Sequence, residues 1–330
     1  MFSLWFQFLA ASLLIILAAR ILSINADKLA ELKNWGRAWI GLVLLATITS
    51  LPELSTTTSA VLILKGEGAS SLAVANVLGS NVFNLFILFF VDILLGTRIV
   101  WESVQENHDI SLLAGVVFTM LICLNIWLLF PWAIGGVGLV CWFIFIAYWP
   151  LMWYLGRVEH PTTANIAPAD SSIGRVVAII VLSAVVVVIS GIWLVGLSDQ
   201  LAEATGWGHS FVGALFIALV TSLPELVVCW TSVRLASVDM AMGNILGSNI
   251  FNLMILFIAD LGYRSGPILV HISPSLLVPA CFGLLMMLIT FFSLKFPRQV
   301  SYLGVSIGSA CLLVAYLTAN YWLFVLSRGN

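Results

Sequence analysis

The sequence contains very little charge. Lysine, arginine, aspartate and glutamate together make up 8% of its 330 residues, whereas a typical soluble domain has about 25%. Hydrophobic residues make up 62%, so a folded chain of this composition cannot cover itself with polar groups in water. We therefore predict an integral membrane protein surrounded by the lipid bilayer, and the composition indicates neither a nucleic acid nor a protein partner.

Cysteine and histidine are also scarce. The five cysteines show no CxxC or Cys/His spacing, so we interpret them as small packing residues rather than disulfides or metal ligands. The four histidines fall in predicted loops or helix ends, which leaves no serine and histidine pair at membrane depth for a protease. An intramembrane enzyme is therefore only a remote alternative, and we expect no catalytic residues and no cofactor.

Long apolar runs are what the sequence has instead. Ten of them are long enough to cross about 30 Å of hydrocarbon as a helix. They lie at residues 2–22, 38–64, 71–96, 110–130, 132–155, 174–198, 210–233, 238–262, 273–294 and 300–325. Because the runs are continuous rather than alternating, they do not suit a closed β-barrel. The predicted fold class is all-α integral membrane, with ten transmembrane helices.

Two short phrases occur twice inside these runs. Residues 46–53 and 218–225 both end in Thr-Ser-Leu-Pro-Glu, and residues 79–84 and 247–252 both read Gly-Ser-Asn-x-Phe-Asn. Proline removes a backbone donor and clashes with the preceding turn, so we expect each helix to break there and free carbonyl groups at membrane depth. The chain is therefore predicted to be two copies of one unit.

The two copies are expected at residues 1–155 and 174–330, with residues 156–173 as a cytoplasmic linker. The distribution of lysine and arginine predicts that both termini lie on the extracytoplasmic side of the membrane. We expect this membrane to be a cell (inner or plasma) membrane. Each copy has five helices, an odd number, so the second copy must enter the membrane inverted relative to the first. Inverted five-helix repeats are typical of transporters with a substrate site near the midplane.

Polar side chains in these runs form four stripes, because residues three and four apart share a helix face. The stripes are Ala46, Thr49, Ser50 and Glu53; Ala218, Thr221, Ser222 and Glu225; Asn76, Ser80 and Asn84; and Asn244, Ser248 and Asn252. By the symmetry of the repeats, we expect all four stripes to converge.

The chemistry of the stripes indicates a cation. Nearly every side chain in them offers oxygen, the ligand of hard cations such as Ca²⁺ and Na⁺. Without histidine or a completing cysteine, zinc and copper do not fit. Glu53 and Glu225 have no basic residue at their depth, so either a proton or a bound cation must neutralise them. The stripes predict a cation carrier, and a channel fits less well because broken helices in an inverted repeat suit a gated midplane site.

At these residues the sequence resembles the sodium/calcium exchanger branch of the calcium/cation antiporter superfamily. The resemblance covers the whole chain, with Leu-Pro-Glu in the second and seventh helices and Gly-Ser-Asn-x-x-Asn in the third and eighth. It implies that Glu53 and Glu225 are the central calcium ligands. It further implies as ion ligands Thr49, Ser50, Thr221, Ser222, Ser80, Asn84, Ser248 and Asn252, with the carbonyl groups of Ala46 and Ala218 at sodium.

The resemblance also implies a mechanism. Family members exchange several sodium ions for one calcium by alternating access, with the first and sixth helices sliding past a core of site helices. This chain departs from the family pattern at three positions, with Ile48 and Val220 in place of glycine and Asn252 where some members have aspartate. A proton/calcium antiporter, or one for another divalent cation, stays as the alternative, because the two glutamates could carry protons.

Two further expectations concern polar residues near the predicted helix ends. The polar segment from Asn25 to Arg37 reads as a short cytoplasmic connection after the first helix. Asp92 and Asp260 correspond between the copies, and we expect them at the interface, where they cap backbone groups or pair with Arg98 and Arg264.

Overall fold

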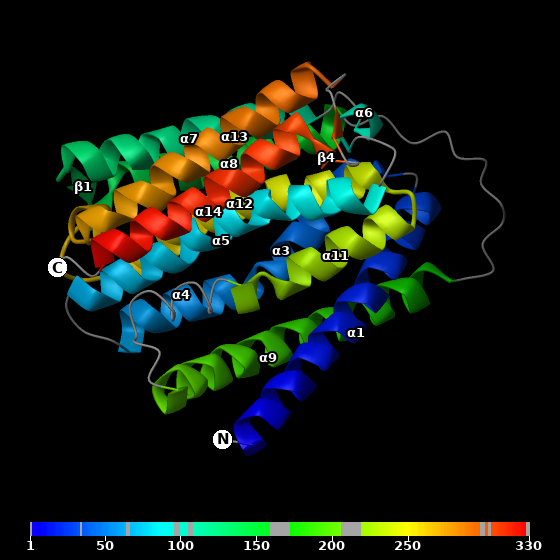
Figure 1. Cartoon of the computed structure of the whole chain (residues 1–330), viewed down its shortest axis with the longest axis horizontal. Coiled ribbons are helices and arrows are strands. Elements are labelled where there is room, and N and C mark those ends of the chain that lie inside the picture. The colour runs from blue at the N-terminus through cyan, green and yellow to red at the C-terminus, as the bar shows by residue number, and fades with distance from the viewer. Residues whose placement is uncertain are drawn as a thin grey trace.

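Helices dominate the computed structural model (Figure 1). The structure describes residues 2–33, 35–63, 67–95, 100–104, 108–158, 172–205, 219–297, 301–302 and 305–327. The α-helices are α1 (Phe2–Lys33), α2 (Arg37–Trp39), α3 (Ala46–Thr49), α4 (Leu51–Ile63), α5 (Glu67–Leu95), α6 (Val100–Ser103), α7 (Asp109–Leu128), α8 (Leu139–Val158), α9 (Ile173–Thr205), α11 (Leu223–Arg234), α12 (Val238–Gly262), α13 (Leu277–Lys295) and α14 (Ile307–Ser327).

Shorter elements connect these helices. A π-helix, η1 (Ile40–Leu45), joins α2 to α3, and two 3₁₀ turns, η3 (Ile268–Val270) and η4 (Pro274–Leu276), lie between α12 and α13. Two antiparallel hairpins precede α8 and α14. They are formed by β1 (Ala133–Ile134) with β2 (Val137–Gly138), and by β3 (Ser301–Tyr302) with β4 (Val305–Ser306).

Within the described residues, eight helices are long and apolar enough to cross a membrane. The pair Arg37–Thr49 and Leu51–Leu62, bent by 40°, makes a ninth span if it is counted as one. The predicted all-α membrane architecture is therefore confirmed. The predicted span at 210–233 lies partly outside the described residues, with α11 as its second part, and most of the predicted linker 156–173 also lies outside them.

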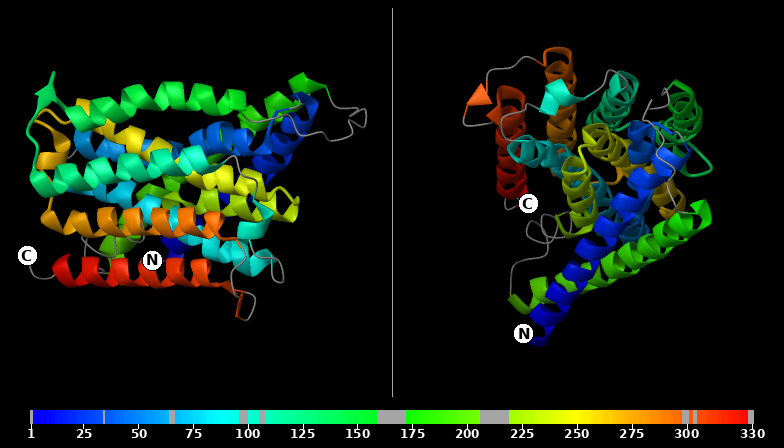
Figure 2. Two further views of the ribbon diagram at one scale, coloured as in Figure 1. Left: turned by 90° about the horizontal axis from the view of Figure 1, so that it is seen from above. Right: turned by 90° about the vertical axis from the view of Figure 1, so that its right-hand side faces the viewer.

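The helices lie in layers around α5 and α12 (Figures 1 and 2). These two helices contact each other in the middle of the molecule, and α7, α8, α13 and α14 pack on one side of them. On the other side come α3, α4 and α11. The long helices α1 and α9 pack chiefly against each other and form an outer pair beyond that layer.

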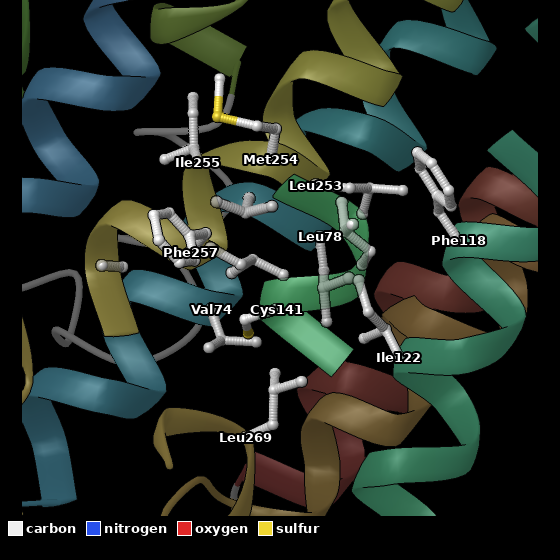
Figure 3. Close-up of a cluster of buried hydrophobic side chains, with 14 of the residues drawn as sticks. Val74, Leu78, Phe118, Ile122, Cys141, Leu253, Met254, Ile255, Phe257 and Leu269 are labelled. Atoms are coloured by element: carbon white, nitrogen blue, oxygen red, sulfur yellow. The ribbon is translucent and has the colours of Figure 1, made fainter. Parts of the chain in front are cut away.

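An apolar cluster fixes α5 and α12 against the first of these sides (Figure 3). Val74 and Leu78 of α5 meet Phe118 and Ile122 of α7, together with Leu253 of α12. Lipid tails are as apolar as these side chains, so close packing rather than the hydrophobic effect holds membrane helices together. The cluster therefore holds in place the two helices that carry the Gly-Ser-Asn phrases.

The two halves of the chain are inverted relative to each other. The helices α5 and α12 run in opposite directions, and the equivalent hairpins, marked by β1 and β4, lie at opposite ends of the molecule (Figure 1). Equivalent hydrogen bonds also occur in the two halves, as the buried side chains of Asp92 and Asp260 show.

Asp260, near the end of α12, binds backbone rather than arginine. Its carboxylate oxygens accept the N–H groups of Ile268 at 2.7 Å and Gly138 at 2.8 Å. The expected capping is therefore confirmed, and the alternative, an ion pair with Arg264, is not among the ion pairs between described residues. Asp260 thus ties the loop after α12 to the hairpin before α8.

Asp92, near the end of α5, makes the equivalent contacts in the first repeat. Its oxygens accept the N–H groups of Val100 at 3.0 Å and Ser306 at 2.7 Å, and the hydroxyl of Ser306 at 2.7 Å. Arg98, the expected alternative partner, lies outside the described residues. One carboxylate therefore fastens one hairpin at each end of the molecule.

Helix α1 is longer than its apolar run. The segment from Asn25, expected as a connection, continues the helix to Lys33, so that expectation is wrong. Its alanine, leucine, lysine and glutamate residues are strong helix formers, and nothing in the segment breaks the helix. Asp27 and Glu31 at this end accept hydrogen bonds from Arg37 at 2.5 and 2.8 Å.

We predict that Asp260→Asn lowers the free energy of unfolding by about 2–3 kcal/mol, because an amide NH₂ would then face one of the two buried N–H groups. Thermal unfolding in detergent measures the change. Glu102→Gln, the same chemical change at an exposed carboxylate, is the control and should leave the unfolding temperature unaltered. Equal unfolding temperatures for the two variants would contradict the role given to Asp260.

Candidate ion-binding site

Both Leu-Pro-Glu phrases start a helix after a break, as predicted from the prolines. Ser50 separates α3 from α4 with φ −88° and ψ 6°, and Ser222 precedes α11 with φ −88° and ψ 8°. Pro52 and Pro224 carry no N–H for the carbonyl group four residues earlier, so each interrupts the helical hydrogen-bond pattern and favours a break or kink there. The two repeats break with the same backbone geometry.

Each break places a glutamate opposite a serine of the other repeat. The Ser50 hydroxyl donates to Glu225 Oε1 at 3.1 Å, and the Ser222 hydroxyl donates to Glu53 Oε1 at 3.1 Å. Both carboxylates are 0% exposed, and within the described residues the second oxygen of each, Oε2, is buried without a hydrogen-bond partner. These two hydrogen bonds between the repeats therefore bring the two carboxylates into one site, each with one free oxygen.

The helices α5 and α12 supply further hydroxyl groups to this site. Ser248 of α12 lies 3.4 Å from Glu225 Oε1 and 3.5 Å from the Thr49 hydroxyl. Ser80 of α5 lies 3.5 Å from the Thr221 hydroxyl. Each of these two helices therefore contacts a threonine of the other repeat.

The remaining predicted residues divide into three cases. Asn84 and Asn252 are fully buried, and each has a side-chain oxygen that no described residue hydrogen-bonds. Ala46 is buried, and its carbonyl group accepts the Ser50 N–H at 3.1 Å and the Thr49 hydroxyl at 3.4 Å. Ala218 lies outside the described residues.

Asn76 and Asn244, from the same stripes, are held by the residue four positions after each glutamate. Asn76 donates to the Thr57 hydroxyl at 2.9 Å, and Asn244 donates to the Cys229 sulfur at 3.6 Å. Thr57 and Cys229 are not among the residues we predicted for the site. Their equivalent positions, Glu53 plus four and Glu225 plus four, are the signal in the sequence that could have identified them.

Asn81 and Asn249 are also missing from our prediction, although both lie inside the repeated Gly-Ser-Asn phrase. Each donates a side-chain hydrogen bond to the backbone carbonyl of the other at 3.2 Å. Reciprocal contacts of this kind mark the point where α5 and α12 cross at the centre of the inverted pair.

Glycines let α2 and η1, the segment before the first helix break, approach α12 closely. A Cβ added to Gly247 would lie 2.1 Å from the Leu42 carbonyl oxygen, and one added to Gly243 would lie 2.3 Å from that of Ala38. On the facing helix, a Cβ at Gly41 would lie 2.2 Å from the Met240 carbonyl oxygen. Small residues at such a crossing allow backbones to touch, which here sets the position of Thr49 against Ser248.

The β-branched residues just before the two Thr-Ser-Leu-Pro-Glu sequences, Ile48 and Val220, face the outer helix pair. Val220 is buried against Ala11 and Ile15 of α1 and Leu197 of α9. Ile48 packs against the larger cluster that α1 and α9 share with the site helices. These two β-branched side chains therefore form part of the contact between the outer pair and the site helices.

Electrostatics favours a cation between the glutamates. The ion pairs between described residues, Arg37 with Asp27 and Glu31, Lys295 with Asp109, and His108 with Asp239, do not involve the site glutamates. Two buried carboxylates without a basic partner are costly unless a cation or proton binds them. Carboxylate, hydroxyl and amide oxygens together suit a hard cation, and the described residues contain no cluster of three His, Cys, Asp or Glu side chains for a softer metal.

A family model for the sodium/calcium exchanger protein matches the chain twice, over residues 3–152 and 175–324. The chain belongs to the sodium/calcium exchanger protein family. The two matches fall on the two repeats, and this exchanger family comprises cation antiporters of the membrane rather than enzymes.

Individual relatives agree with this membership. The membrane protein MJ0091 of Methanocaldococcus jannaschii is 26% identical over 227 residues, 69% of this chain and 71% of that protein. The sodium/calcium exchanger MaX1 of Methanosarcina acetivorans is 27% identical over 266 residues, 70% and 75% of the two chains. A solved structure of the sodium–calcium exchanger NCX_Mj matches with a TM-score of 0.73 and 20% identity over 97% of this chain and 98% of that one, which shows the same fold.

The glycine contact yields a prediction for the exchanger. Gly247→Ala should lower the free energy of unfolding by about 3 kcal/mol, because a backbone carbonyl cannot move aside as a flexible side chain can. Gly174→Ala is the matched control, since a Cβ there meets no atom within 4 Å. Thermal unfolding compares them, and a Gly247→Ala protein as stable as the control would contradict the close approach.

A second prediction concerns the serine crossing. Ser50→Ala and Ser222→Ala should each weaken binding of Ca²⁺ by about tenfold, because each removes the group that orients the glutamate of the other repeat. Equilibrium binding of radioactive calcium to purified protein measures the loss. Ser59→Ala, an exposed position on α4, should bind as the unmodified chain does, and equal affinity in all three variants would overturn this interpretation.

Proposed function

We propose that this antiporter exchanges sodium for calcium at one site built by both repeats. The observation that carries the proposal is the buried pair Glu53 and Glu225, each bound by a serine of the other repeat and each left with one free oxygen. Two ionised carboxylates carry two negative charges, which one Ca²⁺ balances. Several Na⁺ ions that occupy the same oxygen atoms would displace it.

The surrounding residues supply the other oxygen atoms that calcium needs. Ca²⁺ takes about six to eight oxygen ligands in flexible geometry, more than two glutamates provide. We assign the additional side-chain ligands to Thr49, Ser50, Thr221, Ser222, Ser80, Asn84, Ser248 and Asn252. The carbonyl groups of Ala46 and Ala218 are assigned to sodium.

Exchange requires the site to open, because its side chains are fully buried. The outer pair α1 and α9 is the element we propose to move, since these helices pack mainly against each other. Ile48 and Val220 give that pair an apolar surface to move across. We further propose that both termini lie outside the cytoplasm, in a cell membrane.

A proton/calcium antiporter is the second candidate. The same free Oε2 atoms of Glu53 and Glu225 could each hold a proton, and protonated glutamates would release calcium as sodium would. The two candidates share one calcium site and differ only in the ion that competes for it.

The test is uptake of radioactive calcium into proteoliposomes, driven in parallel by an outward sodium gradient and by an outward proton gradient. We expect uptake with the sodium gradient only, and background uptake in Glu225→Gln, because an amide cannot supply the missing charge. Glu102→Gln, with the same change at an exposed position, should transport normally.

The possible outcomes separate the candidates. Uptake driven by protons alone would replace sodium with protons as the coupling ion. Background uptake under both gradients in a folded protein would mean that the site carries another cation. Normal uptake by Glu225→Gln would contradict the assigned site.

A further inference from the structure

Asn81 is a buried polar residue that is not among the proposed ion ligands. It lies at the crossing of α5 and α12, is 5% exposed, and donates its side-chain amide to the Asn249 carbonyl group at 3.2 Å. That hydrogen bond fixes the orientation of the Asn81 side-chain amide. The Nδ2 atom is used across the crossing, so Oδ1 is the end left for other neighbours.

The Asn81 Oδ1 atom accepts a hydrogen bond from the Asn252 side chain, from Nδ2 at 3.0 Å. Asn252 is one of the proposed ion ligands. With its NH₂ group held by Asn81, the amide of Asn252 can only turn its oxygen away from Asn81. That oxygen, Oδ1, is fully buried and has no hydrogen-bond partner in the described part of the chain, as expected of an oxygen available to a cation.

The other repeat does not make the corresponding contact. Asn249 donates to the Asn81 carbonyl group at 3.2 Å, as symmetry requires. However, Asn249 Oδ1 and both amide atoms of Asn84 are buried without a hydrogen-bond partner among the described residues. The orienting bond is therefore present at Asn252 and absent at Asn84, so the two halves of the site differ.

We propose that Asn81 is a positioning residue that selects the orientation of the Asn252 amide and requires a neutral, hydrogen-donating group at position 252. This inference rests on the proposed calcium site. A carboxylate at position 252 would set one of its oxygens against Asn81 Oδ1 and would have to keep a proton to stay there. Asn81 thereby limits the ionised groups of the site to Glu53 and Glu225.

The matched pair Asn81→Ala and Asn249→Ala tests the proposal. Asn81→Ala removes two side-chain hydrogen bonds between α5 and α12, the one to the Asn249 carbonyl group and the one from Asn252. Asn249→Ala removes only the hydrogen bond to the Asn81 carbonyl group and leaves Asn252 held. Titration of the purified full chain with Ca²⁺ should show dissociation constants raised by about tenfold in Asn81→Ala and by less than about twofold in Asn249→Ala. Asn81→Ala should also lose more thermal stability, because it removes one more hydrogen bond, so affinity is compared at a temperature where both variants are fully folded.

A second comparison keeps Asn81 in place. Added carboxylates normally tighten calcium binding, because affinity rises with the charge of the ligands. We expect Asn84→Asp to tighten binding and Asn252→Asp not to, since only position 252 faces the Asn81 oxygen. Glu53 and Glu225, the ionisable side chains of the site, are unchanged in both variants.

The results distinguish this inference from the proposed function. If the unmodified chain does not bind Ca²⁺, the proposed calcium site fails. If it binds Ca²⁺ but Asn81→Ala and Asn249→Ala are equally impaired, the positioning role is overturned. Equal tightening by Asn84→Asp and Asn252→Asp would overturn it as well.

Discussion

The carboxylates of Glu53 and Glu225 are both buried, and no basic side chain among the described residues forms an ion pair with either. Ionised groups in such surroundings must be compensated, and a bound cation or a proton can do so. The structure around Glu53 and Glu225 follows from this constraint. Broken helices bring the glutamates to the centre, serines fix one oxygen of each, and the second oxygen of each stays available.

The crossing of the repeats makes the site a property of the whole chain. Ser50 of the first repeat orients Glu225 of the second, and Ser222 orients Glu53 in return. Glycine contacts and the Asn81 and Asn249 pair hold the crossing helices at backbone distance. A change that separates the repeats would therefore disturb both carboxylates together.

The sequence was sufficient for those features that one local rule controls. Proline predicts the breaks beside Ser50 and Ser222, and helical spacing predicts which polar residues share a face. Contacts between distant segments were not predictable in this way. Asp260 binds the amide of Gly138, 122 positions away, rather than nearby Arg264, and the role of Asn81 depends on how α5 meets α12.

The most direct test of a single shared site is the stoichiometry of calcium binding to purified protein, measured for the unmodified chain, Glu53→Gln and Glu225→Gln. If both glutamates hold the same ion, the unmodified chain binds one Ca²⁺, and either substitution alone removes that binding. If each single variant instead keeps binding calcium with undiminished affinity, the glutamates do not share an ion, and the account of one site built by two repeats is wrong.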